Sequence, residues 1–344
     1  MRSDEALQGA TVADVGGKMR SRIKLTQEGI VATLAVVLFI CFSLTLNNFL
    51  TAGNLIALVR SVAILGILGL GMGLVVISRG IDLAMVATMV VSTSWVLSLA
   101  QAGVPFGVAL LLGAAFVIGV GILTGVLVAY ADVPAIFTTL AVGLAVYGVG
   151  RAYLFQIDVQ NAPADVPLFT FLGSGSILGV PMPIVAFAAL AALMWAVLRY
   201  TRFGRFVYAT GDNLLAARIA GIPVRPLIVA QYILTSLIAY FAGIIMAAAV
   251  SSMSTRVYNS TMIYDVLLVV VLGGISLSGG RGGVRNVLVG TLLVGVLLNG
   301  MTILDIAYTE QNLVKSVILL CALIIDSFIN PRDEQTAQQQ QGDI

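Results

Sequence analysis

Long apolar runs, separated by short polar segments, follow one another along most of the chain. Each run is about 17–25 residues long, which is enough for a helix to cross a hydrocarbon core of about 30 Å. Because backbone polar groups in lipid must find partners within their own segment, the runs predict transmembrane helices. Ten are expected, over residues 28–46, 54–77, 83–101, 106–130, 134–155, 182–199, 226–249, 263–278, 287–303 and 312–329.

The amino-acid composition agrees with this pattern. Of the 344 residues, 59% are hydrophobic and 10% are charged, whereas soluble domains carry about 25% charged residues. A transmembrane barrel would instead show alternating stretches of about 10 residues. The predicted fold class is therefore an all-α, polytopic membrane protein with a transmembrane domain over residues 28–329.

Basic residues are distributed unevenly between the segments that join the predicted helices. With the N-terminus inside the cell, fourteen of the eighteen lysines and arginines fall on the cytoplasmic side, and those outside are Arg60, Arg151, Arg256 and Lys315. This is the positive-inside bias, and an even number of spans places both termini in the cytoplasm. Residues 1–27 are then expected to be a cytoplasmic tail, and residues 330–344 a disordered one.

Several kinds of catalytic chemistry lack their residues in this chain. It has no histidine, no G-x-x-x-x-G-K-[ST] loop and no pair of carboxylates at helical spacing within one span. The chain therefore lacks the histidine of the usual proton relays and the P-loop that binds nucleotide phosphates. Cys41 and Cys321 lie inside predicted spans and are expected to be packed or lipid-facing thiols. No catalytic residue, metal site, bound cofactor or nucleic-acid partner is expected.

Polar residues near the apolar runs are few, and Asp82 is the most informative. Together with Arg79 and Gly80 it interrupts one long apolar region. Charges at membrane depth are costly and usually face an interior or a water-filled path. Two interpretations stay open: a cytoplasmic turn with a local Arg79–Asp82 contact, and a re-entrant break that lines a pathway.

Other polar or small residues within the spans have similar alternatives. Thr139 and Asn299 are candidates for a pathway lining, and interhelical hydrogen bonding is the alternative for both. Asp265 and Asp326 lie at span ends and are expected at membrane interfaces. Gly121 and Gly125 form a small-xxx-small pair, which predicts a close helix–helix contact.

The segment 200–225 is the longest basic interruption between two spans. Asp212 or Asn213 is a good helix N-cap, and the following residues, LLAARIA, all suit a helix. Gly221 fits the position after the helix, and Pro223 prevents its continuation. The pattern predicts a helix of about two turns, which either anchors the loop at the interface or docks into a groove of a partner.

The same segment carries a longer pattern, T-x-F-G-R-x-x-Y-A-x-G-x-N-x-x-A-A-x-x-x-G-I, over residues 201–222. Three further motifs occur along the chain, namely G-I-D-L at 80–83, P-A-I-F-T-T-L at 134–140 and G-G-I-S-L-S-G-G-R-G at 273–282. Taken together and in this order, they resemble the motifs of the ribose-type (monosaccharide) ABC importer permeases. The chain departs from the family at Arg79, where glycine is common, and at residues 84–86, which read A-M-V in place of S-V-G.

The resemblance implies a vitamin B12-importer-like (type II) bundle of about ten helices in the bacterial inner membrane. It implies three kinds of protein partner: an ABC ATPase subunit that binds the ATP, a periplasmic solute-binding protein, and a second permease subunit that is either identical or related. The outside segments 156–181 and 250–262 are then the expected face for the binding protein. The lipid bilayer is a further expected partner, because it surrounds the transmembrane helices.

By the same resemblance, residues 211–222 form the helix that couples the permease to its ATPase. The residues expected to carry this coupling are Arg205, Gly211, Asn213, Leu214, Leu215, Ala217, Arg218, Ile219 and Gly221. Arg281 and Arg285, on the next cytoplasmic loop, are candidates for a second contact. The candidates for the pathway are Arg79, Gly80, Asp82, Thr139 and Asn299.

The expected function is that of a permease subunit that imports a monosaccharide or similar small polar solute. An ABC permease for branched-chain amino acids or another small solute is an alternative with the same mechanism. An ion-coupled secondary transporter is an alternative from another class, and it would need an intramembrane carboxylate, for which Asp82 is the candidate. A membrane enzyme is disfavoured because the chain lacks the residues for it.

Overall fold

A computed structural model describes residues 27–163 and 166–329, and most of this backbone is helical. The α-helices are α1 (Gln27–Thr45), α2 (Ala52–Ile77), α3 (Met85–Gln101), α4 (Phe106–Ala129), α5 (Ala135–Val149), α6 (Pro167–Ser174), α7 (Met182–Tyr200), α8 (Arg202–Asp212), α9 (Leu214–Ile219), α10 (Val224–Val250), α11 (Met262–Leu272), α12 (Val284–Ile303) and α13 (Tyr308–Ile329). Short strands β1 (Val159–Asn161), β2 (Ser176–Ile177), β3 (Val180–Pro181) and β4 (Ser252–Ser254) pair as β1–β4 and β2–β3.

Each of the ten predicted spans corresponds to a helix of the structure. Eight helices of the described residues are long and apolar enough to cross a membrane, and α3 and α11 are shorter apolar helices. The predicted all-α, polytopic fold class is confirmed. The predicted tails, residues 1–27 and 330–344, lie outside the described residues, except that α1 begins at Gln27.

One predicted span boundary is wrong, and another predicted span changes its helical geometry within the predicted bounds. The span predicted over 263–278 ends at Leu272, because Gly274 takes a left-handed φ of 89° and the chain turns there. The span predicted over 134–155 changes from α5 to a π-helical turn, η1 (Gly150–Leu154). Hydropathy continued through both places, so the apolar pattern did not reveal either change of backbone geometry.

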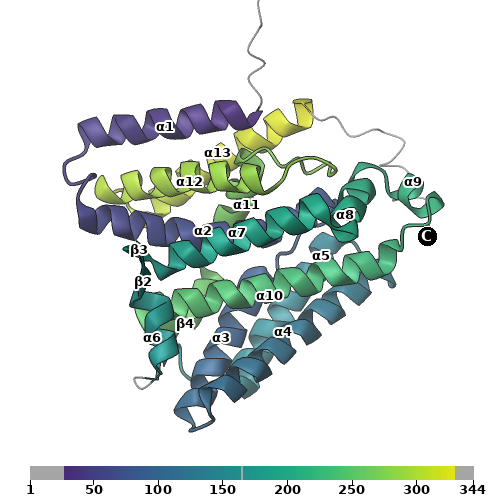
Figure 1. Ribbon diagram of the computed structural model, residues 1–344, viewed down its shortest axis with the longest axis horizontal. Helices are drawn as coiled ribbons and strands as arrows, with labels where there is room; N and C mark the ends of the chain where they lie inside the picture. Colours follow the sequence, from purple (N-terminus) through teal and green to yellow (C-terminus); the bar gives the residue numbers. More distant parts are fainter. Residues whose placement is uncertain (1–26, 164–165, 330–344) are drawn as a thin grey trace, which may run out of the picture.

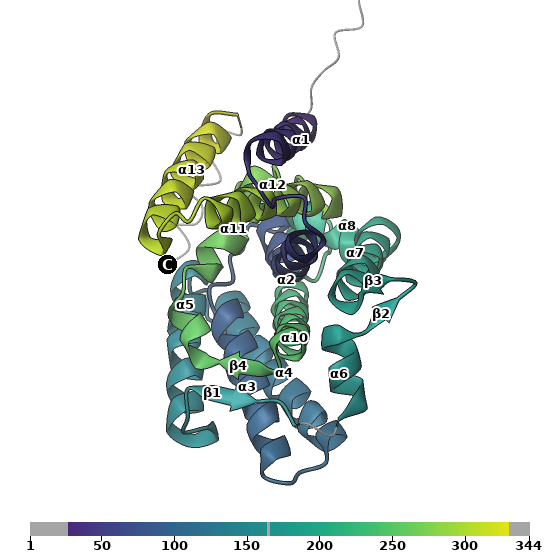
Figure 2. The same cartoon turned by 90° about the vertical axis from the view of Figure 1, so that its left-hand side faces the viewer.

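The long helices run roughly side by side, so that short elements collect at two opposite ends (Figure 1). We call the end that carries α8 and α9 the α9 end, and the end that carries α6 and β1–β4 the α6 end. Figure 2 looks at the α6 end, and α2 and α10 lie near its centre. In agreement, α10 packs against α2, α3 and α4, whereas α12 packs against α1, α2 and α11.

The most extensive helix–helix contact within the described residues is that of α4 with α10. A methyl group added at Gly121 would lie 2.6 Å from the Cα atom of Ile233, and one added at Gly125 would lie 2.6 Å from that of Val229. Real side chains do not tolerate such distances, so both positions require glycine. The helix–helix contact predicted from this small-xxx-small pair is confirmed.

Ion pairs hold the α6 end together. Asp158 lies 2.8 Å from the Arg151 guanidinium and 3.4 Å from that of Arg256. Lys315 of α13 lies 2.7 Å from the Asp265 carboxylate at the start of α11, and both side chains are largely buried. The Lys315–Asp265 pair therefore fixes α13 to α11 at this end.

Candidate functional site

The segment 200–225, predicted to hold one short helix, holds two helices at the α9 end. Helix α8 begins after Thr201, whose hydroxyl accepts a hydrogen bond from the Gly204 backbone N–H at 3.2 Å. It buries Val207 and Thr210 against the bundle and exposes Arg205. The sequence analysis missed α8, although its buried and exposed positions recur with helical spacing.

Helix α9 is the helix predicted from the capping residues. The Asn213 side chain accepts a hydrogen bond from the Ala216 N–H at 2.9 Å, as an N-cap should. At the other end, Gly221 donates to the Arg218 carbonyl and Ile222 to the Ala217 carbonyl, both at 3.0 Å, while Gly221 has a φ of 79°. These bonds form a Schellman motif. The predicted start and end of this helix are confirmed.

The two faces of α9 differ sharply in exposure. Ala217 is 3% exposed and faces the bundle, whereas Leu215 is 48% and Ile219 81% exposed. Arg218, which shares their face because it lies three residues after Leu215, is also exposed. Leu214 is partly buried beside them. An outward surface of two apolar side chains and one cation is suited to a protein partner.

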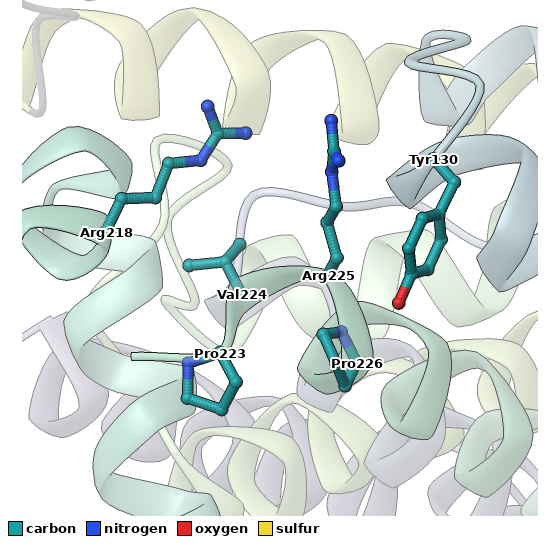
Figure 3. Close-up of a pocket in the computed structure, with 6 residues that line it drawn as sticks. All are labelled: Tyr130, Arg218, Pro223, Val224, Arg225 and Pro226. Atoms are coloured by element: carbon teal, nitrogen blue, oxygen red, sulfur yellow. The ribbon is translucent and has the colours of Figure 1, made fainter. Parts of the chain in front are cut away.

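An open groove lies beside α9, where the chain enters α10. Its lining comes from the residue after α4, from α9 and from the start of α10, and consists of Tyr130, Arg218, Pro223, Val224, Arg225 and Pro226. Figure 3 shows both guanidinium groups on the same side of the groove. The Arg225 guanidinium lies 5.5 Å from the Tyr130 ring centre and 3.7 Å from the Asp132 carboxylate. The groove therefore presents two cations, of which Arg225 is already paired with Asp132.

The second predicted contact, Arg281 and Arg285, lies at the same end of the bundle. Both side chains are exposed. The loop that carries Arg281 is fixed to α8, because the Tyr208 hydroxyl donates to the neighbouring Gly282 carbonyl at 2.9 Å. Burial raises the pKa of the Tyr208 hydroxyl above its usual value, so it stays a donor. A partner role for Arg281 and Arg285 stays a prediction.

Gly211, like Ala217, does not face outward. It is buried in α8, and a methyl group there would overlap the Ile77 carbonyl oxygen and lie 2.6 Å from the Gly280 nitrogen. Gly280 donates to that same carbonyl at 2.7 Å. Gly211 is thus a packing position between three backbone segments, and its predicted part in coupling stays a prediction.

Of the two interpretations left open for the α2–α3 turn, the local Arg79–Asp82 contact is wrong. The Arg79 guanidinium instead reaches α8, where Nε donates to the Gly211 carbonyl at 2.7 Å and Nη2 to the Asp212 carbonyl at 2.6 Å. Asp82 is 3% exposed and accepts a hydrogen bond from the Ala84 N–H at 3.0 Å, at the start of α3. Each residue therefore has a separate structural contact.

The other pathway candidates also bond within the protein. The Thr139 hydroxyl donates to the Ala135 carbonyl of its own helix at 2.8 Å. Asn299 and Asn54 form a reciprocal amide pair, with N···O distances of 2.8 and 3.0 Å. This pair joins α12 to the start of α2, so the structure does not bring Asn299 together with Arg79, Gly80 and Asp82 at the far end of α2. Their role in a pathway stays a prediction.

Comparisons with known proteins agree that this chain is similar to transport permeases. A model described as branched-chain amino acid transport system / permease component matches residues 54–325. The ribose import permease protein RbsC of Escherichia coli (strain K12) is 34% identical over 308 residues, which cover 88% of this chain and 94% of that protein. No solved structure matches, so the vitamin B12-importer-like arrangement stays a prediction.

Two further relatives have other sugars in their names. The galactofuranose transporter permease protein YtfT of Escherichia coli (strain K12) is 32% identical over 275 residues, or 80% of each chain. The fructose import permease protein FrcC of Rhizobium meliloti is 31% identical over 304 residues, or 86% of this chain and 83% of that protein. The resemblance to sugar ABC importer permeases is confirmed. The chain is a multi-pass membrane permease and belongs to the branched-chain amino acid transport system / permease component family.

Proposed function

We propose that this chain is the transmembrane permease subunit of a binding-protein-dependent ABC importer in the bacterial inner membrane. The observation that carries the proposal is α9, a doubly capped helix that exposes Leu215, Arg218 and Ile219 at one end of the bundle. The α9 end is then cytoplasmic, in agreement with the basic residues that collect there.

In this proposal α9 docks on a separate ATPase subunit, which binds and hydrolyses ATP. The apolar pair of α9 would insert into a groove of the ATPase, and Arg218 and Arg225 would meet acidic side chains at its edge. Hydrolysis drives transport only if the docked helix makes different contacts in two global states of the permease.

The remaining partners are assigned to other surfaces. A periplasmic solute-binding protein would dock on the α6 end, where α6 and the two strand pairs form an ordered surface. A second permease subunit, identical or related, would complete the pathway. The cargo is proposed to be a monosaccharide or similar small polar solute, because ribose, galactofuranose and fructose appear in the relatives' names.

The docking assignment is tested by charge reversal on α9. The tagged chain is purified in mild detergent, and the proteins bound to it are identified by mass spectrometry. The wild-type chain is expected to carry a stoichiometric P-loop ATPase. Arg218→Glu should insert normally but bind the ATPase roughly tenfold or more weakly, because like charges across an interface are costly.

A matched control separates docking from a general effect of charge. Arg256→Glu makes the same change at the α6 end, where that side chain is 81% exposed. It should leave the ATPase bound. Wild-type ATPase binding and uptake by Arg218→Glu would contradict the docking assignment.

The cargo needs a separate experiment because the family description names branched-chain amino acids. Proteoliposomes that hold the complete complex are supplied with the binding protein and with radiolabelled ribose, fructose or leucine. ATP-dependent uptake of a sugar and none of leucine is expected. The reverse result would favour the amino-acid alternative.

The ion-coupled alternative depends on Asp82 as a carrier of charge. In the structure this carboxylate accepts a hydrogen bond from the Ala84 N–H, one residue before α3 begins, and the side-chain oxygen of an asparagine can accept the same bond. Asp82→Asn is therefore expected to keep uptake, and depletion of the ATPase to abolish it. Loss of uptake in Asp82→Asn, together with uptake that persists without the ATPase, would favour a secondary transporter.

A further inference from the structure

Three segments that are distant in sequence meet behind α9, and we call their meeting point the α2–α8 junction. It consists of residues 77–79 at the end of α2, residues 211–212 at the end of α8 and residues 279–282 before α12. The Gly280 N–H donates to the Ile77 carbonyl at 2.7 Å, and Arg79 donates to both carbonyls of residues 211–212. The junction is therefore a contact between backbone segments, and the Arg79 side chain bonds two of those segments to each other.

Arg79 has a left-handed backbone conformation, which is unusual for a residue other than glycine. The Gly80 N–H donates to the Val75 carbonyl and the Arg79 N–H to the Val76 carbonyl, both at 2.9 Å, which ends α2 in a Schellman motif. Arg79 occupies the left-handed position of that motif, with a φ of 69°. Glycine suits this position better than any other residue. An arginine there points to a role of its side chain.

The Arg79 side chain ends next to α9. Asp212, whose carbonyl it binds at 2.6 Å, immediately precedes Asn213, the residue that caps α9. Carbonyls at the end of a helix carry partial negative charge, and the fixed fork of a guanidinium can bind two of them at once. The position of the α9 cap is therefore tied to the end of α2.

Among the transmembrane helices, α9 itself packs mainly against α10. It also packs against α8, and it projects from the end of the bundle (Figure 1). On its other side, the α2–α3 turn is bonded to α10, because the Ser78 hydroxyl donates to the Gln231 side-chain oxygen at 2.7 Å. A displacement of α9 can thus pass through Arg79 to α2, α3 and α10.

We propose that Arg79 is a positioning residue that transmits the movement of α9 to the turn between α2 and α3. This inference rests on the proposed docking of α9 on an ATPase. It assigns the coupling to a residue on the first half of the chain, 132 positions away from the carbonyl that it binds.

The test uses the complete complex in proteoliposomes with its ATPase and binding protein, and it measures the number of solute molecules transported per ATP hydrolysed. Arg79→Gly removes the guanidinium and at the same time relieves the left-handed backbone. The variant is expected to keep the ATPase bound and its melting temperature unchanged or raised, while the transport ratio falls about tenfold. Arg79→Lys should give an intermediate ratio, because an ammonium group lacks the two-carbonyl fork.

A second left-handed residue supplies the control. Asn48 also has a φ of 69°, in the turn between α1 and α2 at the opposite end of α2. Asn48→Gly relieves the same backbone conformation without touching the junction, so its transport ratio should equal that of the wild type.

Three results would overturn the inference. A wild-type transport ratio in Arg79→Gly would show that the guanidinium carries no coupling. Loss of the ATPase or a lowered melting temperature in Arg79→Gly would show that Arg79 only supports docking or folding. A wild-type chain that purifies without any ATPase would refute the proposed function, and the coupling role with it, before any variant is compared.

Discussion

Alanine at Gly211 should weaken the α9 end more than its small size suggests. The added methyl group would overlap the Ile77 carbonyl oxygen and approach the Gly280 nitrogen to 2.6 Å. Those two atoms form a hydrogen bond of 2.7 Å with each other. The methyl group of Gly211→Ala therefore fits only if that hydrogen bond breaks or α8 moves.

The size of the effect follows from two contributions. Forcing a methyl group into a filled space costs about 1–3 kcal/mol, and loss of the Gly280–Ile77 hydrogen bond costs about 1 kcal/mol. The free energy of unfolding should thus fall by about 2–4 kcal/mol. Because Gly211 adjoins the residues that Arg79 binds, ATP-driven uptake should fall as well.

The assay is reversible unfolding in mixed micelles by titration with dodecyl sulfate, followed by circular dichroism. Gly119→Ala is the matched control, because Gly119 is also helical and a methyl group there meets nothing within 4 Å. It should be neutral or slightly stabilising, since alanine favours a helix more than glycine does. An unfolding free energy of Gly211→Ala within about 0.5 kcal/mol of the control would refute the steric argument.

Two other predictions concern single contacts. Asn213→Ala removes the cap of α9 and should destabilise this short helix by about 1 kcal/mol. The affinity of the chain for the ATPase should then fall up to roughly fivefold. Asn213→Asp keeps a cap and should bind the ATPase normally, and equal affinities of the alanine and aspartate variants would contradict the capping role. Lys315→Met leaves the buried Asp265 carboxylate without its cation and should lower the free energy of unfolding by about 3–5 kcal/mol. Adding Asp265→Leu should recover most of that loss, and no recovery would show that the ion pair is not the cause.

The features that the sequence predicted correctly depend on local chemistry. Ten helices follow from the length of the apolar runs, because lipid leaves the backbone no other partners. Helix α9 follows from Asn213, Gly221 and Pro223, which act on residues within one or two turns. In both cases the information lies within about 25 neighbouring residues.

The features that were missed depend on distant parts of the chain. Arg79 and Asp82 are three residues apart and oppositely charged, so a local contact between them was one of the two interpretations that the sequence left open. The structure gives Arg79 two carbonyls from α8 instead, 132 and 133 residues later. No local pattern identifies such a partner, although an arginine at a position where glycine is common was a signal that the side chain has a use.

The burial of Gly211 was missed for the same reason. Its neighbours Ile77 and Gly280 come from two other segments of the chain. The end of α11 at Leu272 was missed because Ile275 and Leu277 extend the apolar run beyond the turn at Gly274. Hydropathy reports the environment of a residue and not its backbone angles.

The shortness of α9 has a consequence for the strength of the proposed docking. Six residues of helix extend only about 9 Å, and a stable protein–protein interface buries roughly 800 Å² on each partner. One copy of α9 is too small to hold an ATPase by itself. If two permease subunits each present one copy, the second contact forms at a high effective concentration. Assembly would then be bivalent, and a chain outside its pair would hold the ATPase only briefly.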